Sequence, residues 1–156
     1  MKSGLELGRF SSLSDYTRMY ALFNMGGIYL DVDIEMLGSF DSLLDRKCFL
    51  GFQNSRVVNG AVLGAVPNHP FILACFELLT SRYETPPRDA CKGGPTIITE
   101  VLRQMGLGDY QDEEIQVGDV SVFPTRYFYP YYWNESYQSR CIKDDTFCVH
   151  HWTHLW

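Results

Sequence analysis

Hydrophobic and polar residues follow patterns along the chain that predict both helices and strands. Between residues 16 and 23, aromatic and apolar side chains recur at helical spacing. Ser14 precedes them as a typical N-cap, and the Gly26-Gly27 pair follows as a helix stop. The next segment, 28–33, is β-branched and aromatic and ends in acidic residues, so it is predicted to be a strand that delivers carboxylates at its carboxyl end.

Further elements of both kinds follow along the chain. The pattern predicts two helices, over 71–83 and 96–105, and three strands, over 48–53, 57–66 and 117–123. We find no internal repeat and no linker, and the mixed order of helices and strands is typical of an α/β or α+β protein. An aromatic run over 127–133 is interpreted as core and cover more readily than as a platform for sugars.

Composition narrows the classes of protein that fit this pattern. A length of 156 residues suits one domain, and 46% apolar with 21% charged residues is an ordinary globular composition. The 13 Lys and Arg against 19 Asp and Glu give a net charge of −6, which argues against a general nucleic-acid binder. The sequence has no apolar run long enough to span a bilayer, and its start is not of the signal-peptide type, so neither a membrane span nor export is predicted.

The five cysteines are interpreted as reduced thiols of a cytosolic protein. Their number is odd and no Cys-x-x-Cys pair occurs. A bridge between Cys141 and Cys148 is the oxidised alternative.

The strongest chemical signal is the pair of carboxylates at Asp31 and Asp33. On a strand these side chains would point to one face about 7 Å apart, where a hard divalent cation would relieve their repulsion. A solvated acidic strand end is the alternative, and Glu35 either adds a third acid or is simply exposed. Asp15 and Arg18, three residues apart on the predicted helix, form either a surface ion pair or a pair that faces this acidic end.

Three histidines near the end of the chain form a second group with metal-binding chemistry. His150, His151 and His154 are framed by Trp152 and Trp156, and imidazole ligands would favour Mn²⁺-type ions. A frayed polar tail is the alternative. Two segments of small residues, Asn59-Gly60-Ala61 and Gly93-Gly94, either admit a ligand closely or form turns.

The arrangement of these motifs resembles that of a known enzyme family. The pattern S-D-x-x-R followed by G-G-x-Y-x-D-x-D, over residues 14–18 and 26–33, resembles the DXD-containing nucleotide-sugar glycosyltransferases. Capsular polysaccharide sugar transferases and the initiating α-1,6-mannosyltransferases belong to this group, with the clostridial toxin glucosyltransferases as more distant relatives. The segments 58–61 and 68–70, the Gly94-Pro95 pair and the final His-His-Trp follow in the family's order.

The resemblance implies a GT-A-like α/β fold with a mixed sheet and flanking helices. It implies one sugar- and metal-binding domain over residues 1–156 that lacks most of the usual N-terminal nucleotide-binding segment. Where the family usually ends in Gly-Ser-Trp, this chain has His154-Leu155-Trp156.

The resemblance also implies roles for individual residues. Asp15 and Arg18 would hold hydroxyls of the donor sugar, and Tyr29 and Asp31 would touch the donor. The full substrate-binding set is Asp15, Arg18, Tyr29, Asp31, Asn59, Gly94 and Trp156. Asp31 and Asp33 are the expected catalytic pair and would bind Mn²⁺ or Mg²⁺, together with His151 or, as the alternate, His150.

The function expected from the resemblance is that of a metal-dependent, retaining glycosyltransferase. It would move a hexose from a UDP- or GDP-sugar to a glycan or polysaccharide acceptor, in the cytoplasm with possible membrane association or, alternatively, in the Golgi lumen. Two alternatives are a non-catalytic remnant that binds the sugar nucleotide and a phosphohydrolase of the haloacid dehalogenase type. The latter fits poorly, because Glu35 occupies the position where that class has Thr or Val.

Overall fold

The computed structural model describes residues 10–84 and 93–153, which form a mixed sheet with helices packed against it. The five-stranded sheet has the order β1-β4-β3-β6-β5, in which β3 and β6 are parallel and every other neighbouring pair is antiparallel. A separate antiparallel pair joins β2 to β7. The strands are β1 (Gly27–Leu30), β2 (Ile34–Met36), β3 (Cys48–Phe52), β4 (Val58–Ala65), β5 (Ile115–Val117), β6 (Val120–Phe123) and β7 (Cys148–His150).

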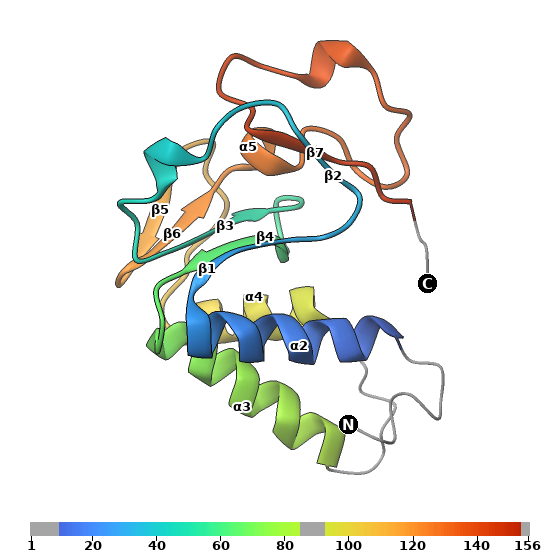
Figure 1. The fold of residues 1–156 in the computed structure, drawn as a ribbon. Helices are drawn as coiled ribbons and strands as arrows, with labels where there is room; N and C mark the ends of the chain where they lie inside the picture. Colours follow the sequence, from blue (N-terminus) through green and yellow to red (C-terminus); the bar gives the residue numbers. More distant parts are fainter. Residues whose placement is uncertain (1–9, 85–92, 154–156) are drawn as a thin grey trace.

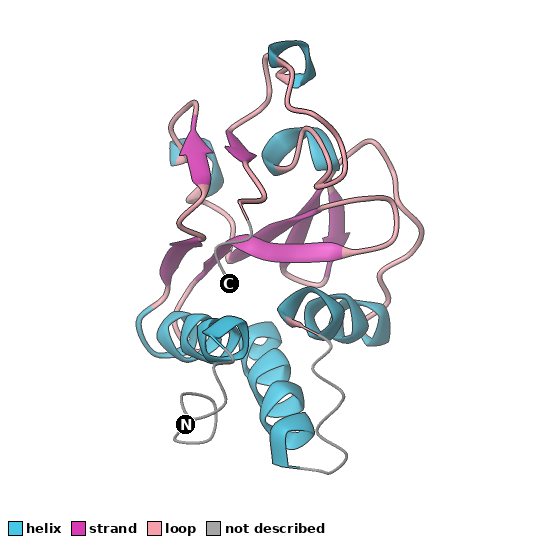
Figure 2. Ribbon diagram, turned by 90° about the vertical axis from the view of Figure 1, so that its right-hand side faces the viewer, coloured by secondary structure: helices cyan, strands magenta, loops and turns pink. Residues whose placement is uncertain are grey.

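Three longer helices cover one side of the five-stranded sheet, and shorter elements cover the other (Figures 1 and 2). The long helices are α2 (Phe10–Met25), α3 (Pro70–Glu84) and α4 (Gly94–Gln104). The other side carries α5 (Thr125–Phe128), the 3₁₀ helices η1 (Asp41–Leu43) and η2 (Ser139–Cys141), and the β2–β7 pair. This arrangement confirms the predicted α/β class with a mixed sheet and flanking helices.

The buried strands alternate between two hydrophobic clusters, one on each side of the sheet. Cys48, Leu50 and Phe52 belong to the cluster on the helix side, whereas Phe49 belongs to the opposite cluster with Phe128. Successive side chains of a strand point to opposite faces, so β3 contributes to both cores. The aromatic run interpreted as core does contribute Phe128 to it.

Three of the predicted element boundaries are wrong. The first helix begins at Phe10, so Ser14 lies inside it and is not its N-cap. The first strand ends at Leu30, which leaves the acidic pair in a turn and not on a strand. The predicted strand 117–123 is a hairpin, because Gly118 takes a positive φ of 62° between β5 and β6.

The described cysteines agree with the prediction of reduced thiols. Cys48, Cys75, Cys141 and Cys148 are all free, so the alternative bridge between the last two does not form. Cys91 lies outside the described residues. Among the helices of the described ranges, none is both long enough and apolar enough to cross a bilayer.

Candidate active site

The acidic pair occupies the turn that carries the chain from the main sheet to the small one. The N–H of Asp31 donates to the carbonyl of Ala61 on β4 at 2.8 Å, which continues the β1–β4 pairing by one residue. The N–H of Ile34 then donates to the carbonyl of Asp31 at 3.2 Å and closes the turn. Val32, between the two acids, is 74% exposed, so the turn lies at the surface.

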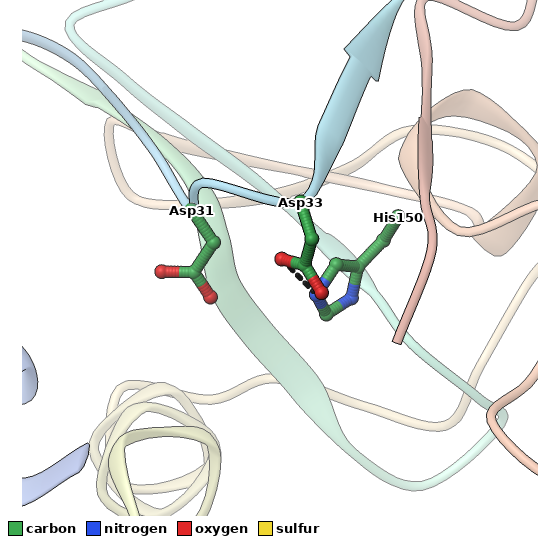
Figure 3. A group of neighbouring side chains, drawn as sticks. All are labelled: Asp31, Asp33 and His150. Atoms are coloured by element: carbon green, nitrogen blue, oxygen red, sulfur yellow. Dashed lines mark hydrogen bonds and ion pairs between the residues drawn. The ribbon is translucent and has the colours of Figure 1, made fainter. Parts of the chain in front are cut away.

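The β2–β7 pairing brings His150 to the same turn. Ile34 is the register partner of His150, so the end of β7 lies beside Asp33 although 117 residues separate them. Figure 3 shows the carboxylates of Asp31 and Asp33 and the imidazole of His150 converging. One ligand atom from each lies within 4.8 Å of the other two.

The Asp33 carboxylate makes three polar contacts with residues 150 and 153. Its Oδ2 accepts hydrogen bonds from the N–H of Thr153 at 2.9 Å and from the Thr153 hydroxyl at 3.1 Å. Its Oδ1 lies 3.1 Å from Nε2 of His150. Burial alone would raise the pKa of Asp33, but the Thr153 hydrogen bonds and the neighbouring His150 outweigh it, so the pKa is lowered and the carboxylate is ionised at neutral pH.

Asp31 is held by a different group of side chains, from α2 and β1. Its Oδ1 accepts a hydrogen bond from the Tyr29 hydroxyl at 2.7 Å and one from Nη2 of Arg18 at 3.3 Å. The Arg18 guanidinium also lies over the Tyr29 ring, 4.5 Å from its centre. Ser14, the residue predicted to cap the helix, instead places its hydroxyl 3.0 Å from that of Tyr29.

Asp15 is buried beneath Arg18 and is fully engaged with the protein. Its Oδ2 accepts the N–H of Gly94 at 2.7 Å, and its Oδ1 lies 3.3 Å from Nη2 of Arg18. Asp15 and Arg18 are each 5% exposed, and burial raises the pKa of Asp15 against the opposing effects of Arg18 and Gly94. Of the two interpretations offered for Asp15 and Arg18, the structure therefore supports a buried pair that faces the acidic turn.

Asn59 and Gly60 support this arrangement from β4. The Asn59 side chain accepts the N–H of Ala61 at 2.8 Å and donates to Gln53 at 2.6 Å, so it is bonded inside the protein. A side chain at Gly60 would meet Nη1 of Arg18 at 3.2 Å and Ile98 at 2.6 Å. The small residue that the sequence singled out here therefore makes room for Arg18.

The two neighbouring histidines have different surroundings. The ring of His150 is buried beside Asp33, whereas Nε2 of His151 pairs with Glu35 at 2.7 Å. His151 was the expected metal ligand and His150 the alternate. The geometry reverses this order, because it brings His150 to the acidic pair. Glu35 is half-exposed and pairs with His151, and Trp156 lies outside the described residues.

Two residues near the turn were missed by sequence reasoning. Thr153 supplies a hydroxyl to Asp33 close to where the resembling family has a serine, and that departure at 154–156 was the signal that could have found it. Tyr129 is buried, and its ring centre lies 5.8 Å from that of His150 and 6.0 Å from that of Trp152. Its position in an aromatic run gave no separate signal.

The residues at the turn fit a divalent cation. In a site of Mg²⁺-like geometry, adjacent ligand atoms lie roughly 3 Å apart, close to the 3.1 Å between Asp33 Oδ1 and His150 Nε2. Within the described part of the chain, Oδ2 of Asp31 has no hydrogen-bond or ion-pair partner. Burial lowers the pKa of His150 and outweighs the opposing Asp33 charge, which keeps the imidazole in the neutral form that binds metals.

Comparison with known proteins identifies the class to which this arrangement belongs. Residues 5–50 match the family described as the glycosyltransferase sugar-binding region containing the DXD motif. This region includes α2, β1 and the acidic turn, so it agrees with the resemblance found in the sequence.

The particular family is given by the rest of the chain. Residues 65–156, more than half of the chain, match the α-1,4-glycosyltransferase conserved region, and the chain belongs to this family. The likeness to capsular and α-1,6-mannosyl transferases stays a prediction.

Individual relatives agree with this assignment. Human α-1,4-N-acetylglucosaminyltransferase is 29% identical over 149 residues, which cover 92% of this chain and 42% of the relative. Mouse lactosylceramide 4-α-galactosyltransferase is 31% identical over 121 residues, 78% of this chain and 32% of the relative. The chain thus spans less than half the length of these relatives.

A solved structure of the PaToxG glycosyltransferase shares the fold. It aligns with a TM-score of 0.58 at 24% sequence identity, over 66% of this chain and 38% of that one.

Proposed function

We propose that this protein is a metal-dependent glycosyltransferase that moves a hexose from a nucleotide-sugar to a glycan acceptor with retention of configuration. The observation that carries the proposal is the convergence of Asp31, Asp33 and His150 within 4.8 Å. Membership in the α-1,4-glycosyltransferase family supports the transfer chemistry, and it favours this function over the phosphohydrolase alternative. Retention of configuration, the single-domain organisation and the cellular compartment remain predictions.

In this proposal Asp31, Asp33 and His150 hold Mn²⁺ or Mg²⁺. When bound, the cation supplies Lewis-acid stabilisation to the diphosphate that leaves the donor sugar. Asp33 is already ionised in the folded protein, so no proton has to leave its carboxylate before it binds the ion, whereas the neutral His150 ring directs its Nε2 proton at Asp33 and would have to move that proton to Nδ1 to offer Nε2 as a ligand.

The residues around Asp31 orient the donor rather than supply protons. Arg18 and Tyr29 both act on Oδ1 of Asp31, which keeps Oδ2 available to the ion or to a sugar hydroxyl. One oxygen of Asp15 contacts Arg18 and the other accepts the N–H of Gly94, so we assign Asp15 the role of holding Arg18 in position. Asp15 and Asn59 were expected to contact the substrate, but in this proposal they do not. Of the expected set, Arg18, Tyr29 and Asp31 keep that role.

Calorimetric titration of UDP- and GDP-hexoses with and without Mn²⁺, followed by a donor-hydrolysis assay, tests the proposal. We expect Mn²⁺-dependent binding and turnover. Binding without turnover would instead identify a sugar-nucleotide-binding remnant, and release of phosphate from simple phosphomonoesters would contradict both assignments.

The variant Asp33→Asn tests the metal site directly. It removes the charge of one ligand, so Mn²⁺-dependent donor binding should be lost. Asp41→Asn, an exposed acid on η1, is the matched control and should bind as the wild type does. Unchanged donor affinity in Asp33→Asn would refute the assignment of Asp33 as a ligand.

A further inference from the structure

A cavity is lined by residues of the segment that joins α5 to β7. Figure 1 shows this segment on the side of the sheet opposite the three long helices. The cavity volume is about 650 Å³, within the roughly 300–1,000 Å³ range of ligand pockets. Its lining is mostly polar and includes Tyr131, Glu135, Ser136, Gln138, Arg140 and Lys143. These residues lie apart from the Asp31–Asp33–His150 group and have no part in the function proposed above.

The cavity wall is nevertheless joined to the candidate metal site. Nε1 of Trp152 donates to the carbonyl of Tyr131 at 3.1 Å, and the Trp152 ring lies 4.1 Å from that of His150. The Tyr137 ring contacts Tyr131 and His151, with both pairs of ring centres 5.5 Å apart. A ligand in the cavity would therefore lie beside the end of β7, next to the place where the donor sugar is expected.

The charges around the cavity favour an anionic group. Arg140 and Lys143 are exposed, and within the described ranges neither has an ion-pair partner; Nζ of Lys143 contacts only the carbonyl of Arg140, at 3.5 Å. The lining carboxylate, Glu135, accepts the N–H of Tyr132 at 2.7 Å through Oε2 and, within the described ranges, forms no ion pair with either cation. The lining thus carries two cations against one carboxylate, a net positive charge in a chain whose net charge is −6.

We propose that this cavity binds an acidic sugar unit of the acceptor glycan. Its carboxylate or sulfate would be held by Arg140 and Lys143, and its ring would lie against Tyr131. Charge-assisted hydrogen bonds of this kind are stronger than neutral ones, and polar side chains such as Gln138 and Ser136 suit sugar hydroxyls. The inference rests on the proposed glycosyltransferase function and names the acceptor class for that same site.

Titration of three related sugars into the chain, in the presence of UDP and Mn²⁺, tests the proposal. Lactose, 3′-sulfolactose and 3′-sialyllactose share a disaccharide and differ in carrying no anion, a sulfate or a carboxylate. We expect at least one acidic sugar to bind roughly tenfold more tightly than lactose, the ratio expected of one charge-assisted hydrogen bond. The stronger of the two identifies the anion. Equal binding of all three sugars would overturn the proposal.

Substitutions locate the site. Arg140→Ala and Lys143→Ala should each bring the affinity of the acidic sugar toward that of lactose, by up to about tenfold, and leave lactose unchanged. Arg56→Ala, at an exposed arginine in the turn between β3 and β4, should change neither. Unchanged affinity in both cavity variants would refute the assignment.

A parallel titration of UDP separates this inference from the proposed function. If the cavity variants weaken UDP binding instead, these cations serve the donor diphosphate and the acceptor proposal is wrong. If the wild-type chain binds no UDP-sugar with Mn²⁺, the proposed function itself fails, and that result is read independently of the acidic sugars.

Discussion

The hydroxyl of Tyr129 fills a gap in the main sheet, and removing it should have a measurable cost. Between Leu50 and Gly51 the pairing of β3 with β4 shifts, so residues 60–62 of β4 have no partner on β3. The Tyr129 hydroxyl accepts the N–H of Val62 at 3.1 Å and donates to the carbonyl of Asn59 at 3.3 Å. Tyr129→Phe would leave the N–H of Val62, in the unpaired stretch, buried and without this partner.

The size of the effect follows from that burial. Val62 is fully buried and Asn59 is 6% exposed, so water cannot replace the lost hydroxyl. A buried polar group left unsatisfied costs about 1–3 kcal/mol, and we expect the free energy of unfolding to fall by about 2 kcal/mol. For a chain of this length that corresponds to a decrease in Tm of about 4–8 °C.

Thermal and urea denaturation of Tyr129→Phe and Tyr127→Phe would measure this effect. Tyr127 belongs to the same aromatic cluster, but within the described residues its hydroxyl has no hydrogen bond, so its variant should unfold like the wild type. The carbonyl of Ala61, in the same stretch of β4, accepts the N–H of Asp31 and so positions this candidate ligand. Loosening of this stretch in Tyr129→Phe should therefore also weaken Mn²⁺ binding several-fold. Equal stability of the two variants would show that the hydroxyl does not complete the sheet.

Two further predictions concern the packing beneath Arg18 and the start of α3. Gly94→Ala would drive a methyl group into the Asp15 carboxylate and should destabilise the fold by about 1–3 kcal/mol, whereas Gly93→Ala meets no atom closer than 3.8 Å and should be tolerated in the same denaturation assay. Burial lowers the pKa of His69 from 6.5 and outweighs the opposing Asp119 charge, so the unfolded chain takes up this proton first and stability should fall as the pH drops below about 6.5. Nδ1 of His69 accepts the N–H of Phe71 in the first turn of α3 at 3.2 Å, and an Asn side chain can accept the same bond. His69→Asn should therefore keep the helix start and make the loss of stability smaller by the contribution of one titrating group; an unchanged pH dependence between pH 7.5 and 5.5 would contradict this interpretation.

Much of the site could be predicted because its chemistry is encoded in short motifs. The Gly26-Gly27 turn, the strand after it and the acidic pair are contiguous, and local rules fix their order. The prediction that carboxylates meet a histidine from the chain end also agrees with the geometry. The predicted cause of this convergence is wrong, however. Asp31 and Asp33 come together because they lie in a turn, and not because they share one face of a strand.

The remaining features depend on contacts between distant residues. Whether His150 or His151 faces the acids is decided by the register of β7 on β2, which a local pattern does not contain. Asn59 carries polar atoms suited to a ligand, yet an irregular strand pairing uses them internally. Tyr129 is one of six aromatic residues in the seven-residue segment 127–133, and only the unpaired stretch of β4 opposite it reveals its role.

Asp33 holds residues 150–153 in place through its hydrogen bonds, in addition to being a candidate metal ligand. The β2–β7 ribbon has only three residue pairs, and a two-stranded ribbon of that size is marginal in water. Beyond the ribbon, the carboxylate holds Thr153 and the Asp33 carbonyl accepts the N–H of His151 at 3.0 Å. A cation bound by the Asp33 carboxylate would either compete with its hydrogen bonds to residues 150–153 or strengthen them. In the proposed metal site, ion occupancy and the position of residues 150–153 would therefore be thermodynamically linked: a change in one would shift the equilibrium of the other by the same free energy.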